Sequence, residues 1–405
     1  MINIKKITAP LLFLLFFSAQ VLLSQIKNEI SWGYYATDIT KYYGIFFIFI
    51  TSLITGYYIS PNITKKIPAD HHESISFSRL YFLVVFSLLF IFLKIYILGD
   101  IPLTSNNPLI RSIGQNLGGL IDYPARLITL LAILSFYAYH RNLAKKVIPI
   151  IIIGYLFNLL MLNRSELLLM TFSMFVIFMF DKRIKFYKFT IYFFLLLFSA
   201  FSIISLLAII RYGSQNIGSG LSLLQLSLWI IHGDLIGALN FGSFVSDIAG
   251  HQQLNGRYTF GEYFSIINPS YGHHGSDYLR DVYLPSRLTA QSVAAPFNYY
   301  LDFGVSGVII ITLAMGAVYK NLRIAFLENK SHILYILFLY FLYNLYLSTR
   351  NGLLPTPPMF VYYSMALLFC FKTKKDSIVS KIKMISDVAF VATWIVSFLG
   401  AVTRV

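Results

Sequence analysis

Long apolar runs alternate with short polar segments along the chain. Runs near 20 residues are long enough for a helix to cross the hydrocarbon core of a bilayer. They cover residues 8–26, 42–60, 80–98, 126–140, 147–162, 166–181, 189–210, 303–319, 332–348, 358–371 and 388–403. This pattern predicts an all-α integral membrane protein, a bundle of about eleven transmembrane helices, or 10–12 because several runs are short.

The composition supports lipid as the main solvent of the chain. Apolar residues make up 57% of the 405 residues, charged residues make up 12%, and the mean hydropathy is +0.69. A water-solvated globule is therefore excluded. The single cysteine, Cys370, lies in an apolar run and can form no intramolecular disulfide, so we expect it to serve packing.

The net charge of +15 is spread in small groups between the apolar runs, which indicates membrane topology rather than a nucleic-acid partner. With Lys5 and Lys6 inside, the inner segments carry 20 Lys and Arg residues and the outer segments carry 11. Lys94 lies near the outer end of its run, where we expect it to snorkel toward the interface. The first run lacks a clean signal-peptide cleavage site, so we expect an uncleaved helix; the side of the C-terminus stays open.

The type of basic residue differs between the two sides. The inner set has 16 Lys and 4 Arg, whereas the outer set has 2 Lys and 9 Arg. Positive-inside sorting does not require this difference, but a guanidinium can grip phosphate oxygens with two parallel hydrogen bonds. The outer side therefore suits an anionic lipid headgroup. Arg164, Arg211 and Arg350 lie at predicted outer helix ends, where simple interfacial anchoring is the alternative interpretation.

A long connection, 211–302, divides the chain into seven N-terminal spans in 1–210, a large outer loop, and C-terminal spans in 303–405. Two apolar stretches of the loop, 221–231 and 235–249, are predicted to form amphipathic or re-entrant helices.

The second half of the loop is rich in aromatic, His, Asp and Arg residues. Such residues recognise sugars, although an interfacial aromatic belt would explain many of the tyrosines. A short helix after Gly275 would place its N-terminus beside His273 and His274, and Asp277 would meet Arg280 one turn later, which is also compatible with a structural ion pair. The chain has no Asp-x-Asp, zinc-ligand spacing, Walker loop or Gly-x-Ser-x-Gly, so we expect no metal and no other cofactor.

The layout resembles the O-antigen and oligosaccharide repeat-unit polymerases of bacterial envelopes, the Wzy type. The resemblance is carried by the hydropathy profile, by Arg164 in NRSELLL, by Arg211 at the start of a large late loop, and by NYYLDFGVSGVIIITLAMG after it. Where relatives often have a basic residue after the proline of the loop, this chain has Ser270 in INPS.

The resemblance implies a GT-C-like glycosyltransferase in the bacterial inner membrane, with a cytoplasmic N-terminus and a periplasmic active face. It implies an undecaprenyl-pyrophosphate-linked oligosaccharide as substrate, surrounding membrane lipids, and a chain-length regulator protein as partner. Together with the Arg pattern, it gives Arg164, Arg211, Arg280 and Arg287 as phosphate ligands. The candidates for the base are His273, His274 and Asp277, with Glu166 and Asp302 as second choices.

Three other functions fit parts of the pattern. An O-antigen ligase uses the same donor and transfers to lipid A core, and topology does not separate it from a polymerase. A polyprenyl-monophosphate glycosyltransferase would have acidic residues together in the first outer loop, where this chain has only Glu29 and Asp38, nine residues apart. A transporter or flippase of lipid-linked oligosaccharide would favour internal repeats and charges at mid-membrane, neither of which is evident.

Overall fold

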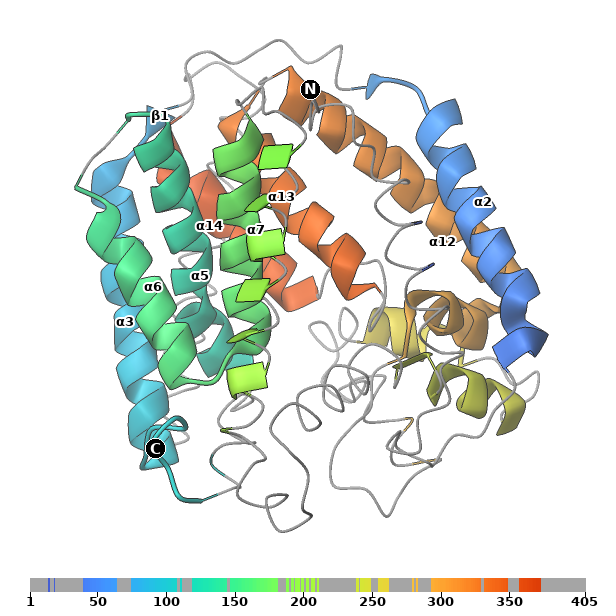
Figure 1. Ribbon diagram of the computed structural model, residues 1–405, viewed down its shortest axis with the longest axis horizontal. Helices are drawn as coiled ribbons and strands as arrows, with labels where there is room; N and C mark the ends of the chain where they lie inside the picture. The colour runs from blue at the N-terminus through green and yellow to red at the C-terminus, as the bar shows by residue number, and fades with distance from the viewer. Residues whose placement is uncertain are drawn as a thin grey trace.

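The structure, a computed structural model, is almost entirely helical in the part that it describes (Figure 1). The described residues are 14, 18, 39–63, 74–107, 110, 119–143, 146–180, 187–188, 191–192, 194–196, 198–199, 202–203, 205–207, 210, 238–239, 241–248, 254–261, 279, 282, 293–328, 331–348 and 357–372.

The elements follow the expected order of apolar runs. They are the 3-10 helix η2 (Ile39–Tyr42), α2 (Tyr43–Ile59), β1 (Ser74–Ile75), α3 (Phe77–Leu98), α5 (Gly119–His140), α6 (Ile148–Leu160), α7 (Arg164–Phe180), α12 (Ala295–Leu327), α13 (His332–Leu347), α14 (Pro357–Cys370) and β2 (Phe371–Lys372). Each of these α-helices overlaps a predicted run, although α5 and α12 begin seven and eight residues before theirs. The runs 8–26 and 388–403 and most of 189–210 lie outside the described residues.

Four of the described helices are long and apolar enough to cross a membrane: Thr40–Ile59, Phe77–Leu98, Ile121–His140 and Ala295–Leu327. Three shorter apolar helices accompany them, Ile148–Leu160, His332–Leu345 and Phe360–Cys370. The described part is therefore all-α and has several helices suited to a multi-pass membrane protein.

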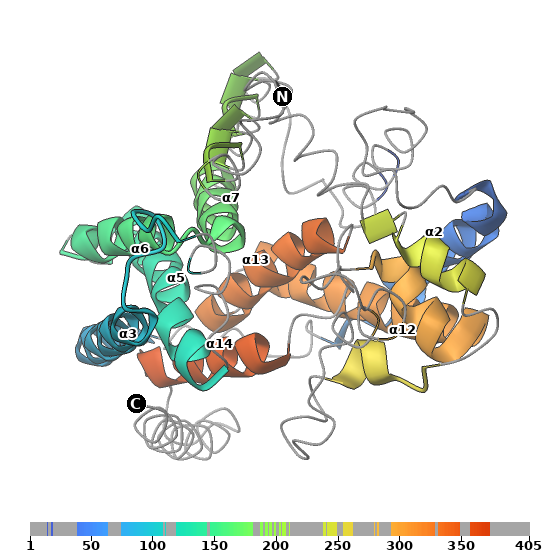
Figure 2. The same cartoon turned by 90° about the horizontal axis from the view of Figure 1, so that it is seen from below.

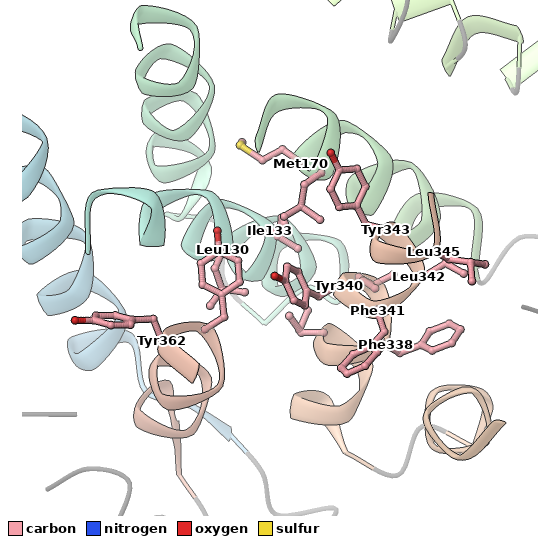
Figure 3. Close-up of a cluster of buried hydrophobic side chains, with 14 of the residues drawn as sticks. Leu130, Ile133, Met170, Phe338, Tyr340, Phe341, Leu342, Tyr343, Leu345 and Tyr362 are labelled. Carbon is pink, nitrogen blue, oxygen red and sulfur yellow. The ribbon is translucent and has the colours of Figure 1, made fainter. Parts of the chain in front are cut away.

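The helices form two packed groups (Figure 2). In the first group α5 packs against α3, α6, α7 and α14, and in the second α2 lies along α12. Helix α13 contacts α12 on one side and α7 and α14 on the other, so it joins the groups. Figure 3 shows side chains of α13 in the core, with Tyr340 near Ile133 of α5 and Tyr343 near Met170 of α7.

The helix ends fall on two sides of the bundle. The upper side in Figure 1, here called the ribbon side, carries the antiparallel pair β1 and β2, in which Ser74 lies opposite Lys372. The opposite side, here called the loop side, carries residues 238–239, 241–248 and 254–261 of the predicted loop and the first residues of α12. From α2 to α7, and again from α12 to α14, successive helices run in alternating directions between the two sides (Figure 1).

Helices α2 and α12 approach closely at two glycines. A Cβ atom on Gly56 would overlap the backbone of Leu313, and one on Gly316 would overlap the backbone of α2 at Leu53 and Tyr57. Small residues at such crossings let helix backbones pack tightly, which is a main source of helix association in lipid.

Helix α12 is broken near the loop side. Gly304 has φ 65° and ψ −157°, a conformation that is essentially restricted to glycine. The helix begins at Ala295, so its first turns before this break belong to the segment that we predicted as the end of the large loop.

Candidate functional site

Three of the predicted site residues, Arg164, Glu166 and Asp302, lie in the described part of the chain. Arg164 and Glu166 occupy the first turn of α7 on the loop side, and Asp302 lies in α12. The other candidates lie outside the described residues: Arg211, His273, His274, Asp277, Arg280, Arg287 and also Arg350.

The turn that carries Arg164 is built by buried asparagines. The backbone reverses at Leu162, which has a positive φ of 54°, and the Asn163 N–H donates to the Asn158 carbonyl at 2.8 Å. The Asn163 side chain donates to Asn158 Oδ1 at 3.2 Å, and Asn158 Nδ2 donates to Thr129 Oγ1 on α5 at 2.9 Å. These contacts fix the start of α7 against α5.

Next to this turn, a carboxylate and a guanidinium face each other across α5 and α7. Arg126 Nη1 lies 3.9 Å from Glu166 Oε1, and the Tyr363 hydroxyl of α14 donates to Glu166 Oε2 at 3.2 Å. The Tyr363 hydroxyl is also 3.3 Å from the Arg126 carbonyl oxygen, and Thr129 is a further hydrogen-bond partner of Glu166. Glu166 thus pairs with a residue of another helix, as expected because residues 164 and 166 do not share a helix face.

A second ion pair joins α3 and α5. Lys94 Nζ donates to Asp122 Oδ1 at 2.5 Å, and the side chain of Lys94 is fully buried. Lys94 also interacts electrostatically with Arg126 and Glu166, so the two pairs form one network with two positive and two negative groups. We name Lys94, Asp122, Arg126 and Glu166 the charge network.

The charge network corrects one expectation from the sequence. Lys94 does not snorkel toward the interface, because its ammonium group turns inward to Asp122. Lys94 and Arg126 lie about one to two turns from the loop-side ends of α3 and α5. Of the four residues, Lys94 alone lies inside a predicted run rather than at or before its first residue, so it alone carried a local signal, because ionisable residues inside apolar runs are usually paired.

The described parts of the predicted loop dock on the loop-side ends of α2 and α12. Asp302 accepts hydrogen bonds from the backbone N–H groups of Tyr258 (3.0 Å) and Thr259 (2.5 Å), and it is fully buried. The Tyr42 hydroxyl donates to Asp247 at 2.8 Å, and Lys41 lies 3.7 Å from the same carboxylate oxygen. Asp302, a second-choice base, thus has the contacts of a helix cap, and Asp247 links the loop to α2.

In the described residues, no group of three or more His, Cys, Asp or Glu side chains is arranged to hold a metal ion.

Comparison of the chain with models of protein families, with curated proteins and with solved structures finds no match. The residues themselves therefore carry the functional argument.

Proposed function

We propose that this protein is an O-antigen repeat-unit polymerase, a glycosyltransferase that joins undecaprenyl-pyrophosphate-linked oligosaccharides. The proposal includes about eleven spans with a GT-C-like arrangement, an inner-membrane location, and the loop side facing the periplasm. The observation that carries it is the sorting of basic residues, because nine of the eleven assigned to the outer side are arginines. Guanidinium groups at that level suit a diphosphate on a lipid carrier.

In the proposed reaction, a sugar hydroxyl of the incoming repeat unit attacks the anomeric carbon of the growing glycan. The bond from that carbon to the diphosphate oxygen breaks, undecaprenyl pyrophosphate leaves with the bonding electron pair, and a base takes the hydroxyl proton. Arg164, Arg211, Arg280 and Arg287 would stabilise the charge on the leaving group, and His273, His274 or Asp277 would accept the proton.

Arg211→Ala should abolish long-chain polysaccharide while leaving membrane insertion intact. Loss of one well-placed charge contact raises the barrier by about 2–4 kcal/mol. The measurement is the length distribution of the polysaccharide from cells that depend on the variant, with Arg211→Lys to separate charge from fork geometry. Arg323→Ala is the matched control, because Arg323 lies away from the loop side. Its Nη1 donates to the Tyr57 hydroxyl at 3.0 Å. An unchanged length distribution in Arg211→Ala would remove this residue from the site.

A flippase or transporter of lipid-linked oligosaccharide is the second candidate, because the charge network places ionisable groups among apolar helices. Purified protein in detergent separates the candidates. A polymerase converts synthetic lipid-linked repeat units into a ladder of longer lipid-linked glycans, whereas transport cannot lengthen them. A ligase would need lipid A core as acceptor, so omitting the core separates ligase from polymerase.

A further inference from the structure

We propose that Arg126 binds a lipid-borne phosphate or diphosphate on the loop side, and that Glu166 and Tyr363 are positioning residues for its guanidinium. The identification of this ligand as the donor diphosphate rests on the proposed function. Arg126 was not among the phosphate ligands expected from the sequence, because its run begins at that residue and nothing local distinguishes it from an interfacial anchor.

The first observation is the accessibility of the four side chains. Lys94, Asp122 and Glu166 are 0%, 5% and 4% exposed, whereas Arg126 is 17% exposed. The charge network therefore reaches the surface of the described structure chiefly through the guanidinium. An approaching anion would meet that positive group before either carboxylate.

The second observation is how the guanidinium is held. The 3.9 Å separation between Arg126 Nη1 and Glu166 Oε1 exceeds hydrogen-bonding distance, so the carboxylate orients the guanidinium mainly through charge. Glu166 is itself fixed by Tyr363 and Thr129. A guanidinium has five N–H donors, and a preorganised fork binds phosphate oxygens at a lower entropic cost than a mobile side chain.

The third observation is depth. Arg126 lies seven residues after Gly119, about 10 Å along α5 from its loop-side end. Because the predicted apolar run begins at Arg126, we expect its guanidinium at the boundary of the hydrocarbon core, which is the level of a lipid phosphate. A purely stabilising role explains the pair less well, since apolar residues of similar volume often stabilise a protein as much as a buried ion pair does.

Arg126→Gln/Glu166→Gln is the decisive variant. It removes both charges, keeps a polar side chain at each position, and leaves neither partner of the pair as an isolated buried charge. The probe is undecaprenyl pyrophosphate, titrated into full-length protein in lipid nanodiscs and followed by native mass spectrometry. We expect binding to weaken about 10-fold to 100-fold, the range for a hydrogen bond to a charged group. Arg141→Ala is the control, because Arg141 lies at the opposite end of α5 over the rings of Tyr137 and Tyr335. This variant should bind undecaprenyl pyrophosphate with the affinity of wild type.

Milder variants test the positioning role. Tyr363→Phe removes the hydroxyl that contacts Glu166; it should weaken binding several-fold and lower the melting temperature slightly, because a buried carboxylate loses one of its hydrogen bonds. Arg126→Lys keeps the charge without the fork of N–H donors, so it should bind the diphosphate less tightly than wild type. This variant replaces the double variant as the test if the double variant does not fold.

Wild-type affinity in the double variant, or in Arg126→Lys where the double variant does not fold, would overturn the proposal. A parallel titration with phosphatidylglycerol identifies the source of the phosphate: weakening for this lipid alone would overturn the donor assignment and leave an anionic-phospholipid site. The two proposals can fail separately. If diphosphate binding depends on Arg126 but the wild-type protein makes no glycan ladder, this inference stands and the polymerase function fails.

Discussion

The buried lysine of α3 shows how one residue departs from its expected role. A lysine one turn from a helix end can reach the interface, and the sequence predicts that it does. In the structure Asp122 lies 2.5 Å away, so inward pairing satisfies the ammonium group within the protein. The partner is 28 residues distant, and no helical spacing relates the two.

Lys94→Met should destabilise the protein strongly, because Asp122 would remain as a buried charge without its partner. Breaking such a pair from one side costs about 3–5 kcal/mol. Lys94→Met/Asp122→Val should recover most of this loss, and a thermal melt in one detergent measures both. Lys41→Met is the matched control, since Lys41 is 60% exposed and its pairing with Asp247 should contribute no more than about 1 kcal/mol. Equal melting temperatures for wild type and Lys94→Met would contradict a buried pair.

At the scale of elements, the α2–α12 crossing depends on small residues, above all on Gly56 and Gly316. Ser52 and Gly56 on α2, and Thr312 and Gly316 on α12, each form a small-xxx-small pair. The apolar runs predict both helices, but every run contains small residues, and only the packed helices show which of them form the crossing.

Gly56→Ala should destabilise the α2–α12 pair by about 1–3 kcal/mol, the usual cost of overpacking. The added methyl group would overlap the Leu313 backbone, which cannot move aside as a flexible side chain could. Gly44→Ala is the control on the same helix, because a Cβ atom there meets nothing within 4 Å. Melting temperatures in one detergent compare the two variants, and equal effects would argue against the crossing.

At the scale of the whole molecule, the ribbon side closes the first helix group with a short antiparallel pair. Residues 74–75 and 371–372 are separated by most of the chain, yet they pair backbone to backbone, and the Ser76 N–H donates to the Cys370 carbonyl at 2.8 Å. These contacts bring the start of α3 beside the end of α14. The sequence predicts eight runs between these two points, and an even number of crossings returns the chain to the same side.

Cysteine labelling tests this sidedness in the membrane. Ser74 and Thr104 are both exposed and lie at opposite ends of α3. With the proposed orientation, a membrane-impermeant maleimide should label Thr104→Cys from the periplasm of cells with a permeable outer membrane. It should label Ser74→Cys only in inverted vesicles. Cys370 is buried, and Cys370→Ser removes any background. Labelling of both sites from the same side would mean that α3 does not cross the bilayer.

The sequence alone determined the fold class and the positions of the described helices. A bilayer requires long apolar segments whose backbone groups bond internally, and such segments are local features of the chain. It also predicted the turn before Arg164, because a tight reversal between two apolar runs leaves few alternatives. The starts of helices were less accurate: α12 begins eight residues before the predicted run, since its polar first turns pack on protein rather than lipid.

Only the tertiary structure decided which charged groups meet. Asp122, Arg126 and Glu166 lie at or near the ends of apolar runs, where interfacial anchoring explains each of them separately. Their pairing depends on the rotation of α3, α5, α7 and α14 about their axes and on the order in which these helices pack. Those quantities arise from side-chain packing between segments far apart in the chain, and hydropathy along a single segment does not contain them.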